Sequence, residues 1–340
     1  MKKSQALWWI AFVVINALFS WGCATSIRTS VLAPARAHDA AKFTRAAVLP
    51  FSGPEGKLIS NNIEALMASV QVHGRSFYNI VERAEIEKVA KENKFQMSDL
   101  VNQATAQSLG KLLGAQAIVV GSVSRYATED KHYKEGRSKC VSKDKKGNCK
   151  WRDFTVSCRQ RTATIQFTPK IINVETGSIA ASEIISGQAS HSACSDSGTP
   201  LKGNNELLDL AMKSALEQYR TFVAPHQTNV KITLITSDNS KMNSQAKDAV
   251  KDGVTWAKAD RLDRACECWN RAALYHKKGY AIPYLIGVCY ETKGELQKAQ
   301  HYYKIADEEA TEPVEELSAA LERVQDRIQK EKVLFEQLEK

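Results

Sequence analysis

The sequence lacks an apolar run long enough to cross a bilayer as a stable helix. Its candidate is the 14-residue stretch from Ala6 to Phe19, which lies between a Met-Lys-Lys start and Ser-Trp-Gly-Cys. At about 1.5 Å per residue such a helix would reach roughly 21 Å, short of the roughly 30 Å hydrocarbon layer. A basic start followed by a short apolar run is typical of a bacterial signal peptide. We therefore expect residues 1–22 to be a leader that is removed on export.

The sequence also lacks the short motifs of common catalytic sites. It contains no phosphate-binding loop, nucleophile elbow or zinc-protease helix, and its seven histidines are scattered along the chain. The paired Cys-x-x-Cys spacing of structural zinc sites is absent as well. These gaps predict a protein without catalytic residues, metal or cofactor, although a triad assembled only in space would leave no such motif.

The residues before Cys23 resemble the lipobox of bacterial lipoproteins, in which a small residue precedes a cysteine that carries diacylglycerol. Gly22 fits this pattern, whereas Ser20 and Trp21 stand where lipoboxes usually have Leu and a small residue. We expect lipidation of Cys23; the alternatives are cleavage after Ala24 or an uncleaved anchor. Several acyl chains would hold the protein on a membrane permanently. Since Ala24 replaces the aspartate that retains many lipoproteins in the inner membrane, the sequence favours the outer membrane, facing the periplasm.

The net charge of +9 is concentrated in one segment. Residues 131–161 contain eleven Lys/Arg and three Asp/Glu, while the rest of the chain is close to neutral. We interpret the segment as a solvated loop, with anionic lipid headgroups, peptidoglycan or an acidic protein as alternative contacts. Nucleic acid is not expected as a partner, because few aromatic side chains accompany the charge: Tyr133, Trp151 and Phe154.

The cysteine content favours an exported protein, because disulfides persist outside the cytoplasm. Four cysteines lie in or near the basic segment, and we expect disulfides among them, with free thiols or zinc binding as the alternatives: Cys140, Cys149, Cys158 and Cys194. Three more are interpreted as buried thiols, with redox activity as the alternative: Cys266, Cys268 and Cys289. The connectivity cannot be deduced, and the odd count without Cys23 leaves at least one thiol unpaired within a single chain.

Strand and helix signals alternate between residues 45 and 224, which predicts an α/β layer fold. Short apolar runs or alternating residues predict strands, and apolar residues at helical spacing predict helices. Strands are expected at 46–51, 77–81, 117–123, 161–174 and 179–189, the last two as a hairpin, and helices at 57–72, 83–93, 98–113 (capped by Ser98 and Asp99) and 206–222. We expect a tether without buried elements at 23–44 and a linker at 225–243.

Three segments in order resemble the curli-production assembly/transport lipoprotein family, CsgG-like. They are Ala-Val-Leu-Pro-Phe from residue 47, Ile-Val-Glu-Arg from residue 80, and Leu-Gly-Lys-Leu-Leu-Gly-Ala-Gln-Ala-Ile-Val-Val-Gly-Ser-Val from residue 109. The resemblance covers about residues 45–224 and implies an envelope lipoprotein with an α/β periplasmic domain. Its branches include ring-shaped export pores for curli subunits, flagellar outer-membrane proteins and activators of peptidoglycan synthases.

The export-pore branch of this family needs long alternating hairpins with apolar faces toward lipid. Here the insertion that is large enough spans residues 131–161, and its charge would be costly against lipid. The sequence therefore favours a scaffold over a channel. An oligomeric ring-forming secretion channel and an activator of a peptidoglycan synthase stay as the alternatives.

A repeat of 34 residues, the tetratricopeptide period, predicts two all-helical repeats at residues 244–310. Five small or aromatic positions in one unit match five in the next: Gly253, Trp256, Ala265, Trp269 and Ala272, then Gly287, Tyr290, Ala299, Tyr303 and Ala306. Small residues let antiparallel helices approach closely, and aromatic residues fill the wedge between helix pairs. Since two repeats leave an end uncovered, we expect residues 311–340 to form a capping helix, with a coiled coil to a partner as the alternative.

Together these patterns predict an outer-membrane lipoprotein that acts as a protein-binding scaffold or assembly factor. The α/β domain would dock on an envelope machine or form a homo-oligomer. The concave groove of the repeats would hold a second envelope protein, through groove or rim contacts from Trp256, Lys258, Asn270 and Tyr284.

Overall fold

The computed structural model describes residues 25–95 and 102–339. The predicted leader, Cys23 and the expected helix caps Ser98 and Asp99 lie outside these residues. Within them, no helix has both the length and the apolar character needed to cross a membrane.

The chain divides into two compact units. The α/β unit comprises Leu32–His226 and Val333–Lys340, and the helical unit comprises residues up to Val31 together with Gln227–Lys332. Each unit has apolar cores of its own: two clusters in the α/β unit and one in the helical unit.

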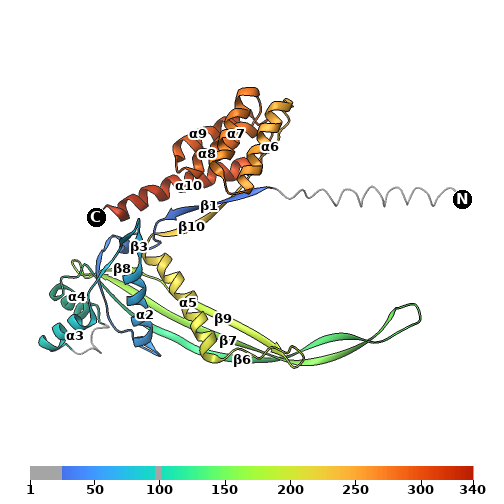
Figure 1. Cartoon of the computed structure of the whole chain (residues 1–340). Coiled ribbons are helices and arrows are strands. Elements are labelled where there is room, and N and C mark those ends of the chain that lie inside the picture. Colours follow the sequence, from blue (N-terminus) through green and yellow to red (C-terminus); the bar gives the residue numbers. More distant parts are fainter. Residues whose placement is uncertain (1–24, 96–101, 340) are drawn as a thin grey trace. The chain divides into compact units, whose positions relative to one another are not determined.

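A mixed sheet forms the centre of the α/β unit (Figure 1). Its strands are ordered β5-β2-β6-β7-β8, and β9 also pairs with β7. The bounds are β2 (Arg45–Val48), β5 (Asn79–Ile80), β6 (Ala117–Lys143), β7 (Cys149–Asn173), β8 (Ile179–Ser182) and β9 (Ile185–Cys194). Strand β2 runs parallel to β5 and β6, whereas β7 runs antiparallel to β6, β8 and β9. The parallel strands are covered on both faces, which is why their sequences are continuous apolar runs.

Helices cover both faces of this sheet. On one face, α2 (Gly56–Ser69) and α5 (Asn204–Val223) share a core with Phe167 of β7. On the other face, α3 (Arg83–Glu92) and α4 (Gln103–Leu112) pack around a second cluster that includes Ile118 and Ile172. The predicted α/β layer fold is therefore confirmed.

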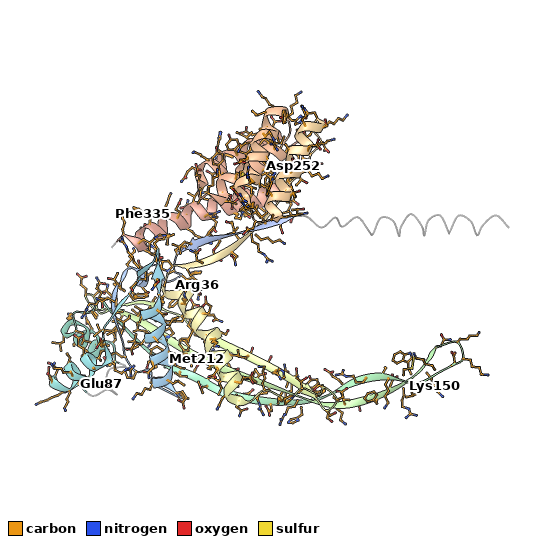
Figure 2. All side chains as sticks on the ribbon, viewed as in Figure 1. Arg36, Glu87, Lys150, Met212, Asp252 and Phe335 are labelled. Carbon is orange, nitrogen blue, oxygen red and sulfur yellow. A yellow bond between two sulfur atoms is a disulfide. The ribbon has the colours of Figure 1, made fainter. Side chains whose placement is uncertain are left out.

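Strands β6 and β7 continue beyond the core as one long hairpin, with Lys150 near its far end (Figure 2). Their pairing runs from Ala117 opposite Asn173 to Lys143 opposite Cys149. The basic segment was expected to be a loop, and this expectation is wrong. The sequence of the outer hairpin shows no apolar period because both of its faces are exposed to solvent. Cross-strand hydrogen bonds, and not burial of apolar side chains, hold its two strands together.

The segment expected to be a tether contains a strand and a helical turn. Strand β1 (Ser26–Ala33) pairs with β10 (His226–Thr233), and η1 (Ala40–Lys42) follows. In the α/β unit, the Ala35 N–H donates to Gln337 Oε1 at 2.9 Å, and the Ala35 carbonyl accepts from Gln337 Nε2 at 3.1 Å. The tether and linker predictions are corrected here, because these polar segments pair with distant residues that the local pattern does not reveal.

The helical unit contains helices that pack as antiparallel neighbours, α6 against α7 and α8 against α9. The bounds are α6 (Ser244–Lys258), α7 (Leu262–Tyr275), α8 (Ala281–Thr292), α9 (Leu296–Glu309) and α10 (Glu315–Leu338). Residues of α10 from Val333 onward count with the α/β unit. Leu317, Ala320 and Val324 of α10 are fully buried in the core of the helical unit.

Candidate interaction surfaces

Two helix crossings in the helical unit repeat at an offset of 34 residues. Gly253 on α6 faces Trp269 on α7, and a Cβ at Gly253 would overlap the indole ring. Gly287 on α8 faces Tyr303 on α9, and a Cβ there would lie 2.7 Å from the phenol ring. Both rings are fully buried. Glycine therefore serves the same purpose at both crossings, which is close approach of an aromatic side chain to the helix backbone.

The remaining repeat positions divide into buried small residues and less buried aromatic ones. Four alanines are fully buried: Ala265, Ala272, Ala299 and Ala306. Trp256, in contrast, is 41% exposed. Tyr290 is half-buried and stacks on Tyr302 with ring centroids 5.3 Å apart. Packing therefore explains the small residues, but it leaves the exposure of Trp256 unexplained.

The two-stranded ribbon formed by β1 and β10 packs into the core of the helical unit. Ile27 of β1, Ile232 of β10 and Leu234 are buried in the same apolar cluster as Tyr284. The Tyr284 hydroxyl donates to the Thr233 carbonyl, and burial raises the pKa of Tyr284 to about 12. Tyr284 is 1% exposed. Its expected role as a groove contact is corrected, because the space beside it is filled by the chain itself.

The other expected partner contacts lie on the surface. Trp256 is flanked by Arg261 and Arg264, whose guanidinium carbons each lie 6.0 Å from its ring centre. We call these three residues the Trp256 cluster. Lys258 is exposed near the end of α6, and Asn270 is exposed on α7 with its amide donating to a backbone carbonyl one turn earlier at 2.8 Å. The Trp256 cluster thus combines an exposed indole with two cations.

A buried ionic cluster joins α8, α9 and α10. The Glu291 side chain is fully buried and accepts two hydrogen bonds from Arg323, both at 2.9 Å. Arg327 donates to the same carboxylate at 3.0 Å, and the Tyr303 hydroxyl donates at 2.6 Å. Burial acts to raise the pKa of Glu291, but the hydrogen bonds and charge of Arg323 outweigh it and hold this pKa below its ordinary value. The carboxylate is therefore ionised and fully paired, which is what permits its burial.

The cysteines of the helical unit were expected to be buried thiols, and this expectation is partly wrong. Cys266 of α7 and Cys289 of α8 form a disulfide with a Cα–Cα distance of 5.6 Å. Cys268 is a buried free thiol. The bond links the two helix pairs, and its partners are 23 residues apart in sequence, so local spacing did not indicate it.

The expected disulfides in the basic hairpin are present. Cys140 pairs with Cys149 near the turn, and Cys158 of β7 pairs with Cys194 of β9. The Glu135 carboxylate lies close to the second bond, with all three ligand atoms within 4.8 Å of one another. Because zinc binds thiolates, the disulfide removes both sulfurs as ligands. While the Cys158–Cys194 disulfide is intact, it stabilises the hairpin, and Glu135 and the two sulfurs are not suited to hold a metal.

The end of this hairpin, residues 139–154, combines positive charge with exposed aromatic rings; we call it the hairpin tip. It contains six Lys/Arg and two Asp. Trp151 is 63% exposed and Phe154 36%, and the Lys139 ammonium lies 5.5 Å from the Phe154 ring centre. Asp144 accepts backbone hydrogen bonds in the turn, chiefly from Asn148, and these lower its pKa. One of the two acids is thus occupied in shaping the turn.

A serine and a histidine make a contact that resembles part of a catalytic triad. Ser240 Oγ lies 2.9 Å from His276 Nε2. Both oxygens of nearby Asp238, however, accept backbone N–H groups, from Ser240 at 2.8 Å and from Ala281 at 2.7 Å. Burial acts to raise the pKa of Asp238, but the hydrogen bonds from the Ser240 side chain and from the two backbone N–H groups outweigh it and leave the pKa lowered. The carboxylate caps the start of α8 and does not orient the imidazole as a triad requires.

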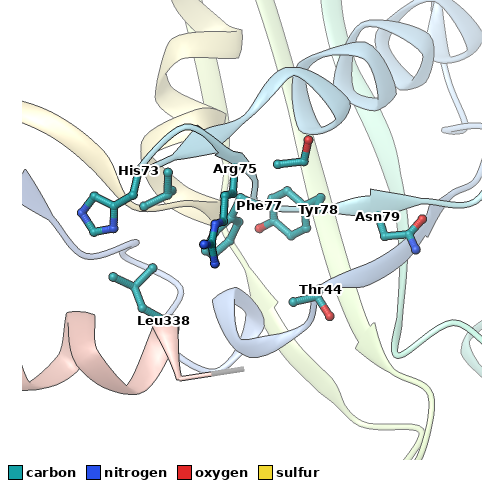
Figure 3. A pocket seen from close by; sticks show the side chains of 9 residues that line it. Thr44, His73, Arg75, Phe77, Tyr78, Asn79 and Leu338 are labelled. Atoms are coloured by element: carbon teal, nitrogen blue, oxygen red, sulfur yellow. The ribbon is translucent and has the colours of Figure 1, made fainter.

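A hollow of about 650 Å³ opens beside the short hairpin of β3 (Gln71–Val72) and β4 (Arg75–Ser76), as Figure 3 shows. Its lining side chains include His73, Arg75 and Tyr78. The Tyr78 hydroxyl donates to the Val223 carbonyl at 2.7 Å, and burial raises its pKa. The described residues that line the hollow include no carboxylate. The hollow presents cationic, hydroxyl and amide groups.

A family model described as Curli production assembly/transport component CsgG matches residues 48–254, more than half of the chain. The chain belongs to this family. The match runs from β2 through β10 and into α6. The CsgG region therefore extends beyond residue 224, where the sequence resemblance was expected to end. A comparison with curated proteins found no match.

A comparison with solved structures found matches of low sequence identity. The lipoprotein GNA1162 from Neisseria meningitidis is 15% identical, with a TM-score of 0.29, covering 52% of this chain and 97% of that one. The LpoB C-terminal domain from Salmonella enterica is 15% identical, with a TM-score of 0.24 and coverages of 42% and 81%. The PelC dodecamer from Paraburkholderia phytofirmans is 14% identical, with a TM-score of 0.24 and coverages of 59% and 99%.

Proposed function

We propose that this CsgG-family chain is an exported envelope lipoprotein that works as a binding scaffold and not as an enzyme. The support comes from family membership, the leader pattern ending at Cys23, and the disulfide-bonded cysteines. The outer membrane is the membrane we favour. The helical unit is proposed to be a tetratricopeptide pair, because its glycine–aromatic crossings recur at the same 34-residue offset.

The Trp256 cluster carries the proposal that the helical unit binds a protein. Trp and Arg are enriched among the side chains that dominate binding energy at protein interfaces. The Trp256 indole lies between two guanidinium groups and is 41% exposed, so a large part of the ring is open to a partner. Since the chain itself fills the space beside Tyr284, we place the partner at the surface around Trp256, with Lys258 and Asn270 as further candidate contacts.

Site-specific crosslinking in cells tests this surface. Trp256→Ala should reduce recovery of the crosslinked partner by tenfold or more, since truncating such a residue costs about 2 kcal/mol or more. Leu274→Ala is the matched control, because Leu274 is an apolar α7 residue that is 77% exposed and lies outside the cluster. Both variants should keep the thermal midpoint. Equal partner recovery from the two variants would count against the proposal.

Membrane attachment is tested separately. Cys23→Ser should abolish incorporation of a labelled fatty acid and move the processed protein from the membrane fraction to the periplasmic fraction. Continued membrane attachment without label would favour an uncleaved anchor instead.

Self-association is a second candidate, and it rests on the sheet edges. Among the described residues, β6 beyond Ser124 pairs with β7 alone, and β9 also pairs with β7 alone. Such edges expose unpaired N–H and C=O groups that another strand can use. Light scattering of the purified protein should then show an oligomer, whereas a monomer at all concentrations would remove this candidate.

A further inference from the structure

We propose that the hairpin tip docks on an anionic lipid surface. The scaffold function does not require this contact, which would be a second attachment in addition to lipidated Cys23. It rests on three observations: the charge of the tip, the kind of cation that carries it, and the placement of its exposed aromatic rings.

The first observation is the excess of positive charge on the hairpin tip, which is not neutralised by ion pairs within the described ranges of the chain. The tip carries six Lys/Arg against two Asp. Asp144 is engaged in the turn, and Asp153 accepts a hydrogen bond from Ser138 at 2.5 Å. Throughout the described part of the chain, no ion pair involves a Lys or Arg of the tip. Its cations therefore face solvent as a concentrated positive field, which attracts an anionic surface.

The second observation distinguishes a lipid surface from a protein partner. Five of the six cations are lysines, with Arg152 as the exception. Lysine is depleted at protein interfaces, where Arg is preferred for its planar hydrogen-bonding fork. Lysine ammonium groups are compact, well hydrated and carried on long stems, which suits the diffuse negative field of lipid phosphates. The composition therefore favours headgroups over an acidic protein.

The third observation concerns where the aromatic rings lie. Trp151 is opposite Cys140 and Phe154 is opposite Arg137, so the two rings are three residues apart on one strand and point to opposite faces. A hairpin lying flat could press one of these rings against a surface. A hairpin that meets the surface end-on can place both rings at headgroup depth, where indole partitions well. The cations exclude deeper insertion, because charge in hydrocarbon is costly.

The Cys140–Cys149 disulfide fixes the conformation of the hairpin tip before it binds a surface. A two-stranded hairpin is marginally stable alone in water. In the part of the chain that the structure describes, β7 between Cys149 and Ser157 pairs with β6 alone. The Cys140–Cys149 bond closes the outer end, with a Cα–Cα distance of 5.4 Å. Trp151 and the lysines are therefore held together before any surface is met.

Vesicle sedimentation tests the proposal with the chain from residue 24 onward, which keeps every described element and removes the leader and Cys23. It should bind phosphatidylglycerol vesicles and not phosphatidylcholine vesicles. Each cation near an anionic surface contributes about fivefold in partitioning, so Lys145→Gln with Lys146→Gln should weaken binding by roughly 25-fold. Lys88→Gln with Lys91→Gln removes the same charge from exposed positions on α3 and should leave binding unchanged.

Fluorescence separates lipid contact from simple charge attraction. The chain from residue 24 contains three tryptophans, Trp151, Trp256 and Trp269. Brominated phosphatidylglycerol should quench the protein, and Trp151→Phe should remove the quenching while Trp256→Phe keeps it. Equal vesicle binding by the two double-lysine variants would overturn the proposal. Binding to dextran sulfate without binding to vesicles would also overturn it, in favour of a soluble polyanion.

Discussion

The two units differ in what their interiors contain. The α/β unit buries apolar side chains on both faces of its sheet, and α5 approaches β9 at Gly187, where a Cβ would meet the Ala211 carbonyl and lie 2.6 Å from the Ala215 nitrogen. The helical unit adds an ionic cluster around Glu291 to its apolar core. The stability of the α/β unit should therefore depend on how well its side chains pack. The stability of the helical unit should also depend on the protonation of Glu291.

The largest effect is expected from Gly187→Leu in the α/β unit. The new side chain would collide with the α5 backbone, which cannot move aside without displacing the helix. We expect loss of more than about 4 kcal/mol of folding free energy or failure to fold, measured by chemical denaturation. The control is Gly136→Ala on β6 of the same sheet, where nothing lies within 4 Å of the added Cβ; it should change stability by less than about 0.5 kcal/mol. Similar losses of folding free energy in both variants would show that close packing at Gly187 is not what stabilises the α/β unit.

Glu291→Gln should destabilise the helical unit by about 3 to 5 kcal/mol, because Arg323 and Arg327 would lose the buried charge that pairs with them. Thermal unfolding followed by circular dichroism measures the change. Glu267→Gln is the control, since Glu267 is exposed and pairs with Arg264 on the surface. An unchanged midpoint for Glu291→Gln would show that the cluster adds no stability.

The same cluster predicts a pH dependence. The pKa of Glu291 is lower in the folded chain than its ordinary value of 4.5, so the folded state keeps this carboxylate ionised at pH values where the unfolded chain takes up a proton. Its contribution is complete above that ordinary value and is lost as the pH falls through the lowered folded pKa. Denaturation between pH 3 and 7 should show a steeper acid loss for the wild type than for Glu291→Gln. Parallel curves would contradict this assignment.

Gly253→Ala and Gly287→Ala test whether the two helix crossings are equivalent. Both add a methyl group against a buried ring, and overpacking of this kind costs roughly 1 to 3 kcal/mol. The loss should be larger at Gly253, because the rigid indole of Trp269 is met more closely there than the Tyr303 ring is at Gly287. The reverse order in chemical denaturation would show that the crossings relax differently.

The smallest effect is expected from removing the tip disulfide. Cys140→Ser with Cys149→Ser should shift the global midpoint by less than about 2 °C, because the tip is exposed and outside the cores. Cys266→Ser with Cys289→Ser should lower it by several degrees, since that bond lies in the helical core. Comparable shifts would mean that the outer hairpin folds together with the α/β core.

Sequence patterns predicted the parts of the fold that are organised by burial. The apolar run before Phe51 and the run from Ala117 became strands, and Gly253 and Trp269 became a helix crossing. Patterns missed the outer β6–β7 hairpin, β1 and β10, because pairing between distant polar segments leaves no apolar period. The sequence likewise could not show that Tyr284 is covered by the ribbon, since its neighbour Thr233 is 51 residues earlier.

The hydrogen bonds between Ala35 and Gln337 have a consequence for synthesis on the ribosome. The two residues are separated by 302 positions, and both the N–H and the carbonyl of Ala35 are buried against the glutamine amide. Until residue 337 has emerged from the exit tunnel, these groups must stay hydrated or find substitutes. This edge of the α/β unit therefore closes only after translation has reached residue 337, well after every strand of the sheet has been made.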